Sequence, residues 1–179
     1  MSVAKTYLEE SLKSFHGMKS NAEKAIAQLS NQDLHYKPDA ESNNIVIIMK
    51  HLAGNMLSRF TDFLTTDGEK PDRNRDIEFE DDFTSREALM NFWNKGWTCV
   101  FDAINNLSED DLLKTVYIRD EPHTVLRAIQ RQLVHYAYHC GQIVFLAKQI
   151  RSTDFKTLSI ARGKSNEFTV KRPQPNSNI

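Results

Sequence analysis

The chain has 179 residues, of which 40% are hydrophobic and 26% are charged, and it contains only 6 glycines and 5 prolines. This length suits one domain that buries its core without disulfides or a structural metal, and the scarcity of turn residues favours helices over an all-β fold. Lysines and arginines number 23 against 24 aspartates and glutamates, with both signs scattered along the chain, so the charge pattern gives no support for nucleic-acid binding.

The cysteines and the first residues favour a cytoplasmic protein. Cys99 and Cys140 stand alone in apolar surroundings and form no CxxC pair or disulfide framework, which favours buried free thiols in a reducing compartment. The opening stretch MSVAKTYLEESLKSF is amphipathic and lacks the apolar segment and cleavage site of a signal peptide. Because no run of about 18 or more apolar residues occurs, we expect no membrane span.

Two helices are predicted in the first third of the chain. From about Val3 to Leu29 apolar residues recur at spacings of three and four, the pattern of a helix with one buried face. The polar stretch SNQDLHYKPDAESNN follows and predicts a loop that ends in an asparagine cap. A second, more apolar helix is predicted from about Ile45 to Leu64, with His51 inside it.

A long charged connection and a third helix come next. The stretch TTDGEKPDRNRDIEFEDDFT has about 20 residues, and a connection of that length in a compact domain is either disordered or functional. Thr84, followed three residues later by Glu87, forms a capping box. This start signal predicts a third helix from about Ser85 to Asn106.

The fourth helix is predicted after a mixed segment. We expect one helical turn from Glu109 to Leu113 and an extended piece from Val116 to Arg119. Pro122 is interpreted as a first-turn proline that opens the last helix. The helical spacing of apolar residues then continues to about Ile150.

The four segments predict an all-α four-helix bundle. Helices of about 20 to 28 residues would be about 30 to 40 Å long, which suits such a bundle. Two connections are long, at about 20 residues each, so we expect long crossover connections instead of simple hairpins. Residues 1–168 are predicted to form one domain, and residues 169–179 a polar, flexible tail.

Two histidines lie four residues apart in RQLVHYAYHCGQI, near the end of the last predicted helix. Residues with this spacing project from one face of a helix about 6 Å apart, so His135 and His139 can both bind one metal ion. The same spacing also occurs between ordinary surface or partly buried histidines. Alone, the pair is weak evidence for a metal site.

A third histidine strengthens the metal interpretation. His51 lies in the middle of the most apolar helix, where an unpaired imidazole is costly to bury, and metal sites in bundles are built from facing helices. Three imidazoles and a water molecule form an open site of the catalytic type. The alternative is a core histidine bonded to a carbonyl or a neighbouring side chain. His123 is unsuitable, because it lies roughly 120° around the helix and about 18 Å along it from His135.

The position of His51 also suggests the walls of a substrate pocket. Asn55 and Arg59 lie one and two turns after it on nearly the same stripe, and Arg119, just before the fourth helix, can hold an anionic group. Each has an ordinary alternative, in which Asn55 caps a buried contact and the arginines pair with acidic loop residues. For Arg119 that alternative is favoured, because surface ion pairs are common. The acidic residues considered are Asp72, Asp76 and Glu78.

Other chemically notable side chains are assigned to packing. Cys140 points about 100° away from His139 on the helix, so core packing is favoured over a role as ligand or nucleophile. Trp93 and Trp97 lie four residues apart and fit a core or a dimer interface. No Ser-His-Asp set, glycine-rich phosphate loop or carboxylate pair competes as an active site.

Four stretches taken in order resemble a known family: HLAGNMLSRFTDFLTTDGEKPDRNRD, IRDEPHTVL, RQLVHYAYHCGQIVFLAK and FKTLSIARGKS. The chain is similar to the DinB-like superfamily of metal-binding four-helix bundles, and more closely to an uncharacterised, Bacillus-type branch of it. The resemblance covers about residues 5 to 168. It implies a divalent metal ion held by His51, His135 and His139, with water completing the site.

The resemblance also implies a range of functions. The superfamily includes thiol transferases that use bacillithiol or mycothiol, a maleylpyruvate isomerase that uses a small thiol, and many proteins without known activity; dimers are common. We therefore expect a cytoplasmic homodimer that binds zinc or nickel and transfers a low-molecular-weight thiol to an electrophilic small molecule, binding neither nucleic acid nor membrane. The alternatives are a metal-dependent hydrolase, and a non-catalytic bundle with structural or no metal that acts through dimerisation or partner binding.

Overall fold

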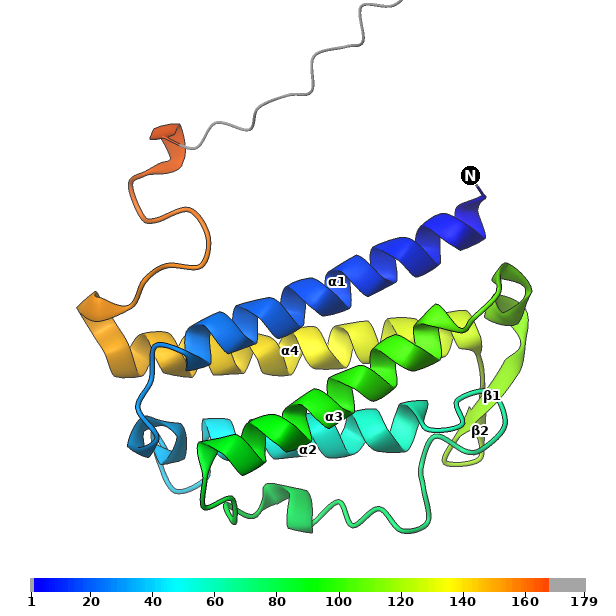
Figure 1. Cartoon of the computed structure of the whole chain (residues 1–179), viewed down its shortest axis with the longest axis horizontal. Coiled ribbons are helices and arrows are strands. Elements are labelled where there is room, and N and C mark those ends of the chain that lie inside the picture. Colours follow the sequence, from blue (N-terminus) through cyan, green and yellow to red (C-terminus); the bar gives the residue numbers. More distant parts are fainter. Residues whose placement is uncertain (1, 168–179) are drawn as a thin grey trace, which may run out of the picture.

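Four long helices make up most of the computed structural model, which describes residues 2–167 (Figure 1). They are α1 (Val3–Ile26), α2 (Ile45–Phe60), α3 (Arg86–Asn105) and α4 (Val125–Arg151). Two short strands, β1 (Thr115–Ile118) and β2 (Glu121–Thr124), pair antiparallel. Short 3-10 helices lie in the connections, namely η1 (Gln32–His35), η2 (Ile77–Phe79) and η3 (Glu109–Leu113), and two more follow α4, namely η4 (Ser152–Asp154) and η5 (Ser165–Glu167). The predicted all-α four-helix bundle is confirmed.

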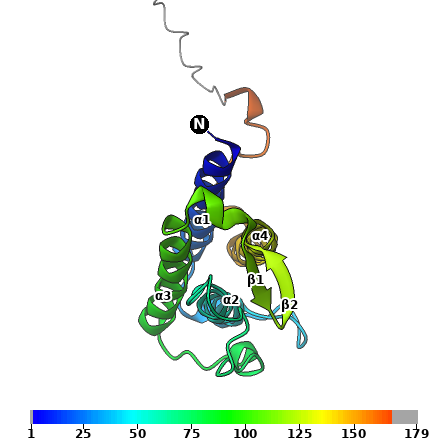
Figure 2. The same ribbon diagram turned by 90° about the vertical axis from the view of Figure 1, so that its right-hand side faces the viewer.

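The helices form a ring in the order α1, α4, α2, α3, as the end-on view shows (Figure 2). Within it, α1 packs along α4 and α2 packs along α3. The two helices of each pair run in the same direction, and the two pairs run in opposite directions (Figure 1). Residues 61–85 therefore return the chain along the bundle as a crossover, whereas residues 106–124 join antiparallel helices. Only one of the two long connections crosses over.

Side-chain caps set the starts of α2 and α3. The Asn44 side chain accepts a hydrogen bond from the Ile47 amide at 2.9 Å, so the predicted asparagine cap is confirmed. Ser85 caps α3, because its hydroxyl accepts from the Ala88 amide at 3.1 Å. The prediction that Thr84 is the cap was one residue too early.

The start of α4 differs from the prediction because of the β-hairpin. Pro122 does not open α4; it lies in β2 opposite Tyr117 of β1. A two-stranded sheet tolerates it there, since each strand is an edge that needs no donor on its outer side. The helix begins at Val125, and its cap is Thr124, whose hydroxyl accepts from the Arg127 amide at 3.1 Å.

Asp67 of the crossover connection fixes the turn of the hairpin. The two central residues, Arg119 and Asp120, have φ values of 57° and 61°, a left-handed conformation that residues with a side chain rarely adopt. The Asp67 carboxylate accepts hydrogen bonds from both of their amides at 2.9 Å. Nearby, the Gly68 amide donates to the Tyr117 carbonyl at 2.8 Å. These bonds hold the hairpin, and with it Arg119, against the connection.

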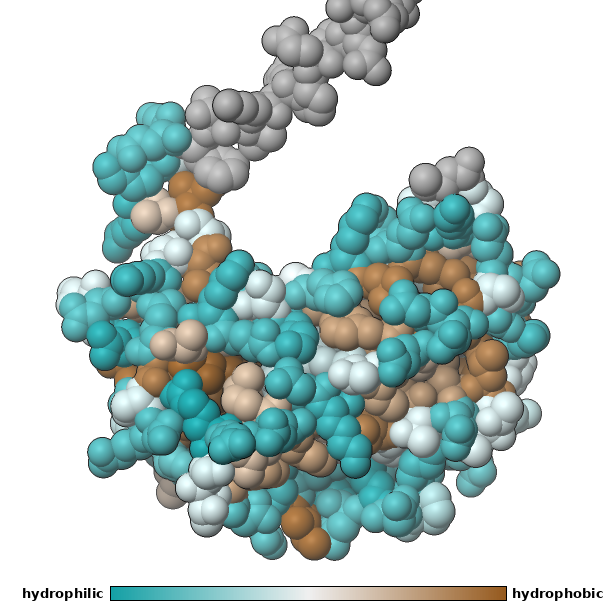
Figure 3. Space-filling view, in the orientation of Figure 1, coloured by the Kyte–Doolittle hydropathy of each residue, from teal (hydrophilic) through white to brown (hydrophobic). Residues whose placement is uncertain are grey.

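Aromatic side chains from three helices fill the centre of the bundle. Phe15 of α1, Trp97 of α3 and Tyr136 of α4 are fully buried, and their ring centroids lie 5.7 to 6.2 Å apart. Trp93 and Cys140 are buried as well, so their assignment to the core is confirmed. On the face seen in Figure 3, hydrophilic side chains cover most of the surface and apolar groups show through in patches. Among the described helices, none combines the length and the apolar character that crossing a membrane requires.

The segment after α4 folds back onto the bundle. Gln28 and Lys156 exchange two hydrogen bonds, one of 3.1 Å to the Lys156 carbonyl and one of 2.7 Å from its amide. Phe155 and Leu158 pack against the core. This segment therefore belongs to the same domain. The predicted boundary at residue 168 and the predicted flexible tail, residues 169–179, lie outside the described residues.

A close approach of α2 and α3 gives a test of this packing. A Cβ atom on Gly96 would lie 2.9 Å from the Ala53 Cα, too close for a side chain. Gly96→Ala should therefore lower the free energy of unfolding by about 1 to 3 kcal/mol through overpacking, as measured by chemical denaturation. Gly17→Ala is the matched control, because a Cβ there meets nothing within 4 Å; it should raise stability by up to about 1 kcal/mol. Equal effects at both positions would contradict the close packing.

Candidate metal centre

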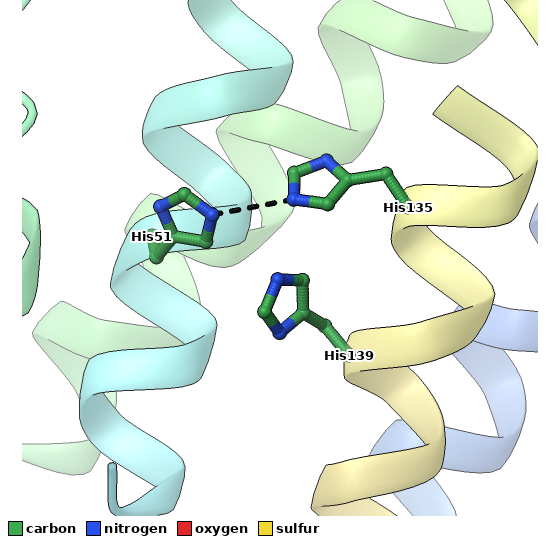
Figure 4. A group of neighbouring side chains, drawn as sticks. All are labelled: His51, His135 and His139. Carbon is green, nitrogen blue, oxygen red and sulfur yellow. Dashed lines mark hydrogen bonds between the residues drawn. The ribbon is translucent and has the colours of Figure 1, made fainter. Parts of the chain in front are cut away.

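Three histidines meet between α2 and α4. His51 of α2 and His135 and His139 of α4 each offer a ring nitrogen, and these nitrogens lie within 4.8 Å of one another. Their rings point into the same space (Figure 4). Within residues 2–167 no other group of three or more histidine, cysteine or acidic side chains is arranged in this way. The structure thus brings together all three ligands predicted from the sequence.

The spacing of the nitrogens suits a metal ion. The Nε2 atoms of His51 and His135 are 3.3 Å apart, and two nitrogens bound to a tetrahedral zinc ion at ~2.0 to 2.1 Å lie about 3.3 Å apart. His51 is buried, whereas His135 and His139 are half-buried. The site is therefore accessible from one side, and three imidazoles leave one position of a tetrahedral ion open.

Hydrogen bonds to the outer ring nitrogens orient two of the three imidazoles. The Nδ1 atom of His51 lies 2.9 Å from a Glu78 oxygen, and the Nδ1 atom of His139 lies 2.7 Å from the Gln142 amide oxygen. Because these oxygens accept, each Nδ1 donates its proton, and in the neutral tautomer that donates from Nδ1 the lone pair lies on Nε2. That tautomer binds a metal through Nε2, and partners of this kind commonly orient metal-binding histidines.

The carboxylate that orients His51 comes from η2 in the crossover connection. Glu78 also accepts two hydrogen bonds from Arg73, each 2.8 Å long, and both side chains are less than 10% exposed. Burial by itself would raise the pKa of Glu78, but the bonds from His51 and Arg73 outweigh it. The pKa of Glu78 is therefore held below its ordinary value, and the group stays charged at neutral pH.

Gly54 leaves the space through which Glu78 reaches His51. It lies three residues after His51 on α2, and a Cβ atom there would be 2.9 Å from the carboxylate carbon of Glu78. The next residue of the connection, Phe79, stacks on the His51 ring with centroids 4.9 Å apart. The connection thus contacts His51 through both the Glu78 carboxylate and the Phe79 ring.

Glu78 was considered from the sequence only as a partner for arginine, so its role beside His51 was missed. The local pattern does not reveal this burial: Glu78 stands between the apolar Ile77 and Phe79 in an otherwise polar stretch, which predicts burial of those two neighbours, yet Ile77 is 44% exposed and Glu78 is buried. Which group such a buried carboxylate meets depends on how the connection packs. The sequence period does not specify that packing.

Burial keeps the imidazoles of α4 neutral. Desolvation, followed by repulsion from His139 and His51, lowers the pKa of His135 to about 3. Desolvation also lowers the pKa of His139, against the opposing effect of its hydrogen bond to Gln142. Near neutral pH both rings are therefore uncharged, as metal ligands must be.

A pocket of about 270 Å³ opens beside the histidines. It is lined by two of the three histidines and by two buried amides, namely His51, His135, Asn55 and Gln132. Five arginines complete the lining: Arg59, Arg73, Arg75, Arg119 and Arg131. The three residues predicted to form a substrate pocket, Asn55, Arg59 and Arg119, all lie here. Three larger hollows, of about 590, 670 and 720 Å³, are lined by none of the three histidines.

The predicted pocket residues also have partners within the protein. The Asn55 side-chain oxygen accepts a hydrogen bond from the Tyr136 hydroxyl at 3.1 Å. Arg59 pairs with Glu69 at 2.9 Å, and Arg119 pairs with the same carboxylate at 3.0 Å. The expectation that Arg119 pairs with an acidic loop residue therefore holds, but its partner is not one of the three considered from the sequence.

The fold and the histidines define a helical bundle with a candidate metal centre between two of its helices. Residues 2–164 match the family described as "Protein of unknown function (DUF1572)", and the protein belongs to this family, which has the DinB-like fold. Comparison with curated proteins and with solved structures finds no match. The family assignment agrees with the fold but names no function, so a function has to be inferred from the candidate site.

The bond between Glu78 and His51 can be tested through metal affinity. Glu78→Gln should weaken zinc binding by about ten- to hundredfold, because the carboxylate no longer orients the imidazole and raises its basicity. Competition with a chromophoric chelator measures this change, and circular dichroism checks that the variant is folded. Glu80→Gln, at an exposed position two residues away, should bind zinc like the wild type. Unchanged affinity in Glu78→Gln would show that Glu78 has no such role.

Proposed function

We propose that the protein binds a divalent metal ion through His51, His135 and His139 and transfers a small thiol to an electrophilic small molecule. The observation that carries the proposal is the convergence of three imidazole nitrogens at the wall of a polar pocket. Imidazole ligands suit zinc and nickel. A site with three protein ligands and an open position is the catalytic type.

The chemistry of the site would be divided between the ion and the chain. A bound divalent ion lowers the pKa of a thiol beside it, so that the nucleophilic thiolate is present at neutral pH. The three histidines place the reaction at the pocket wall, and the Asn55 and Gln132 amides and the arginines orient the second substrate. The thiolate sulfur forms a bond to carbon, the leaving group departs with its bonding electrons, and the thiol proton passes to solvent.

The pocket lining offers no carboxylate base for hydrolysis. A hydrolase that deprotonates water with a side chain needs such a base, and within residues 2–167 no carboxylate lines the pocket. Glu78 is committed to His51 and Arg73. A hydrolase here would therefore have to use water activated by the metal ion itself, so hydrolysis is the second candidate function, and the product assay below separates it from thiol transfer.

A purely structural metal would need a closed site with four protein ligands. The described residues supply three. Cys140, next to His139, is buried in the core, and burial raises the pKa of its thiol to about 12. Its thiolate form, which is the form that binds metal, is thus strongly disfavoured, and a closed structural metal site has no fourth ligand among the described residues.

Three further parts of the proposal rest on the sequence. The low-molecular-weight thiol and the homodimeric state follow from the resemblance to thiol-using DinB-like proteins, and the cytoplasmic location follows from the isolated cysteines. Both cysteines are free in the structure. The thiol, the homodimer and the cytoplasmic location are therefore proposed on the sequence alone.

Metal analysis tests the first half of the proposal. Purified protein should hold or take up about one zinc or nickel ion per chain, and His51→Ala and His139→Ala should each lose it, because two imidazoles bind far more weakly than three. Elemental mass spectrometry and equilibrium titration measure the stoichiometry. His16→Ala, at an exposed histidine of α1, is the control and should keep the ion. Folded wild-type protein that takes up neither metal would refute the assignment.

The second half of the proposal requires a product. Zinc-loaded protein, incubated with bacillithiol or another small thiol and a panel of electrophiles, should give the thioether adduct by mass spectrometry. Treatment with EDTA or the His51→Ala substitution should abolish the adduct. A hydrolysed electrophile in place of the adduct would favour the hydrolase, and no metal-dependent product with any electrophile would leave a binding role only.

A further inference from the structure

The pocket beside the histidines carries more positive than negative charge. Five arginines line it, and no acidic side chain does so within the described residues 2–167. Within the described residues three carboxylates form ion pairs with these arginine side chains: Glu69, Glu78 and Glu121. A fourth carboxylate, Asp67, accepts from the Arg119 amide. Five guanidinium groups against four carboxylates leave one positive charge in excess before any metal ion binds. Such an excess in a concave, partly buried region attracts anions.

Three of the arginines form ion pairs with one shared carboxylate in the pocket wall. Glu69 is shared between Arg59 at 2.9 Å, Arg73 at 3.2 Å and Arg119 at 3.0 Å. Arg73 also contacts Glu78 at 2.8 Å. Each guanidinium has five N–H donors, so one shared carboxylate leaves many of them for other acceptors.

Arg75 and Arg131 are the two arginines without a strong partner. Arg75 lies over the Phe79 ring at 5.0 Å and makes no ion pair within the described part of the chain. Arg131 has its nearest carboxylate, Glu121, at 3.9 Å, and the two side chains are 44% and 66% exposed, so water weakens their attraction. One arginine belongs to the crossover connection and the other to α4. A ligand that binds both would join the two walls of the pocket.

Two buried polar atoms in the lining also lack partners. The Nε of Arg59 and the Oε1 of Gln132 make no hydrogen bond to any described residue, although their side chains belong to residues only 6% and 3% exposed. Buried polar groups are nearly always satisfied. An anion in the pocket would accept from the Arg59 Nε–H, and the Gln132 amide can turn to offer its NH₂ group.

The size of the pocket limits what can enter. Its volume of about 270 Å³ is just below the ~300 to 1,000 Å³ of drug-sized ligand sites. It therefore suits an acidic group on a short chain and is too small for a polymer. We propose that it binds the carboxylate or phosphate group of the protein's small-molecule ligand, and that Arg75 and Arg131 contact this oxyanion directly. The inference rests on the proposed function, because the bound oxyanion would position the ligand for reaction at the histidines.

Titration of two anions tests the pocket without relying on the metal. Inorganic phosphate and succinate are titrated calorimetrically into full-length protein that EDTA treatment and dialysis have freed of metal. We expect at least one to bind, more weakly at higher salt. Arg75→Gln and Arg131→Gln should each raise the Kd about tenfold, the effect of losing one charge-assisted hydrogen bond. Both side chains are exposed at the pocket rim, so the variants should fold normally.

The matched control is Arg127→Gln, which removes the same charge one turn before Arg131 at an exposed position outside the pocket. Its Kd should equal that of the wild type. Binding of phosphate alone would identify a phosphoryl group, and binding of succinate alone a carboxylate; either supports the proposal. No binding of either anion at millimolar concentration, or an equal loss in Arg127→Gln, would overturn it. Failure of zinc binding would refute only the proposed function, because these titrations contain no metal.

Discussion

The Glu78 carboxylate connects the parts of the structure on which the candidate site depends. It accepts a hydrogen bond from His51 in α2 and two from Arg73 in the crossover connection, and all three side chains are less than 10% exposed. Breaking such a buried pair from one side leaves an uncompensated charge, which is strongly unfavourable. The carboxylate therefore fastens the connection to the bundle and, by the same bonds, fixes the proton of His51 on Nδ1. Arg73 also pairs with Glu69, so the ion-pair network extends from Glu78 to the other arginines of the pocket wall.

The topology explains why the connection is available for this role. Because α2 and α3 run in the same direction, the chain has to travel back along the bundle between them (Figure 1). The returning segment places η2 against α2, where it covers His51, and its earlier residues hold the hairpin turn through Asp67. Residues 61–85 thus serve as the outer wall of the site, while α2 and α4 supply the candidate ligands from within the bundle.

The features that the sequence predicts are those that the helical period controls. The helices follow from apolar spacing, and the convergence of His51, His135 and His139 follows from spacing plus the rule that sites in bundles form between facing helices. Contacts between irregular segments have no such period and are not predictable in this way. Pro122 was assigned to a helix because the pairing of two four-residue strands leaves almost no pattern, and Glu78, Arg75 and Arg131 were missed as site residues because no period links a loop to the helix it covers. The positions of Asn55, Arg59 and Arg119 in the pocket lining were predicted, since their distance from His51 or from the start of α4 could be counted.

Gly54 is the residue through which the contact between Glu78 and His51 leaves a pattern in the sequence. A glycine within a helix usually destabilises it. Here the absence of a side chain leaves room for the carboxylate that reaches His51. The pattern is a helical histidine followed three residues later by glycine, with an arginine and a glutamate five residues apart in the next connection. It indicates a carboxylate that bonds to the histidine, which the spacing of the histidines alone does not reveal. A larger residue at position 54 would push the Glu78 carboxylate from its place beside His51, because a Cβ atom there would lie 2.9 Å from the carboxylate carbon.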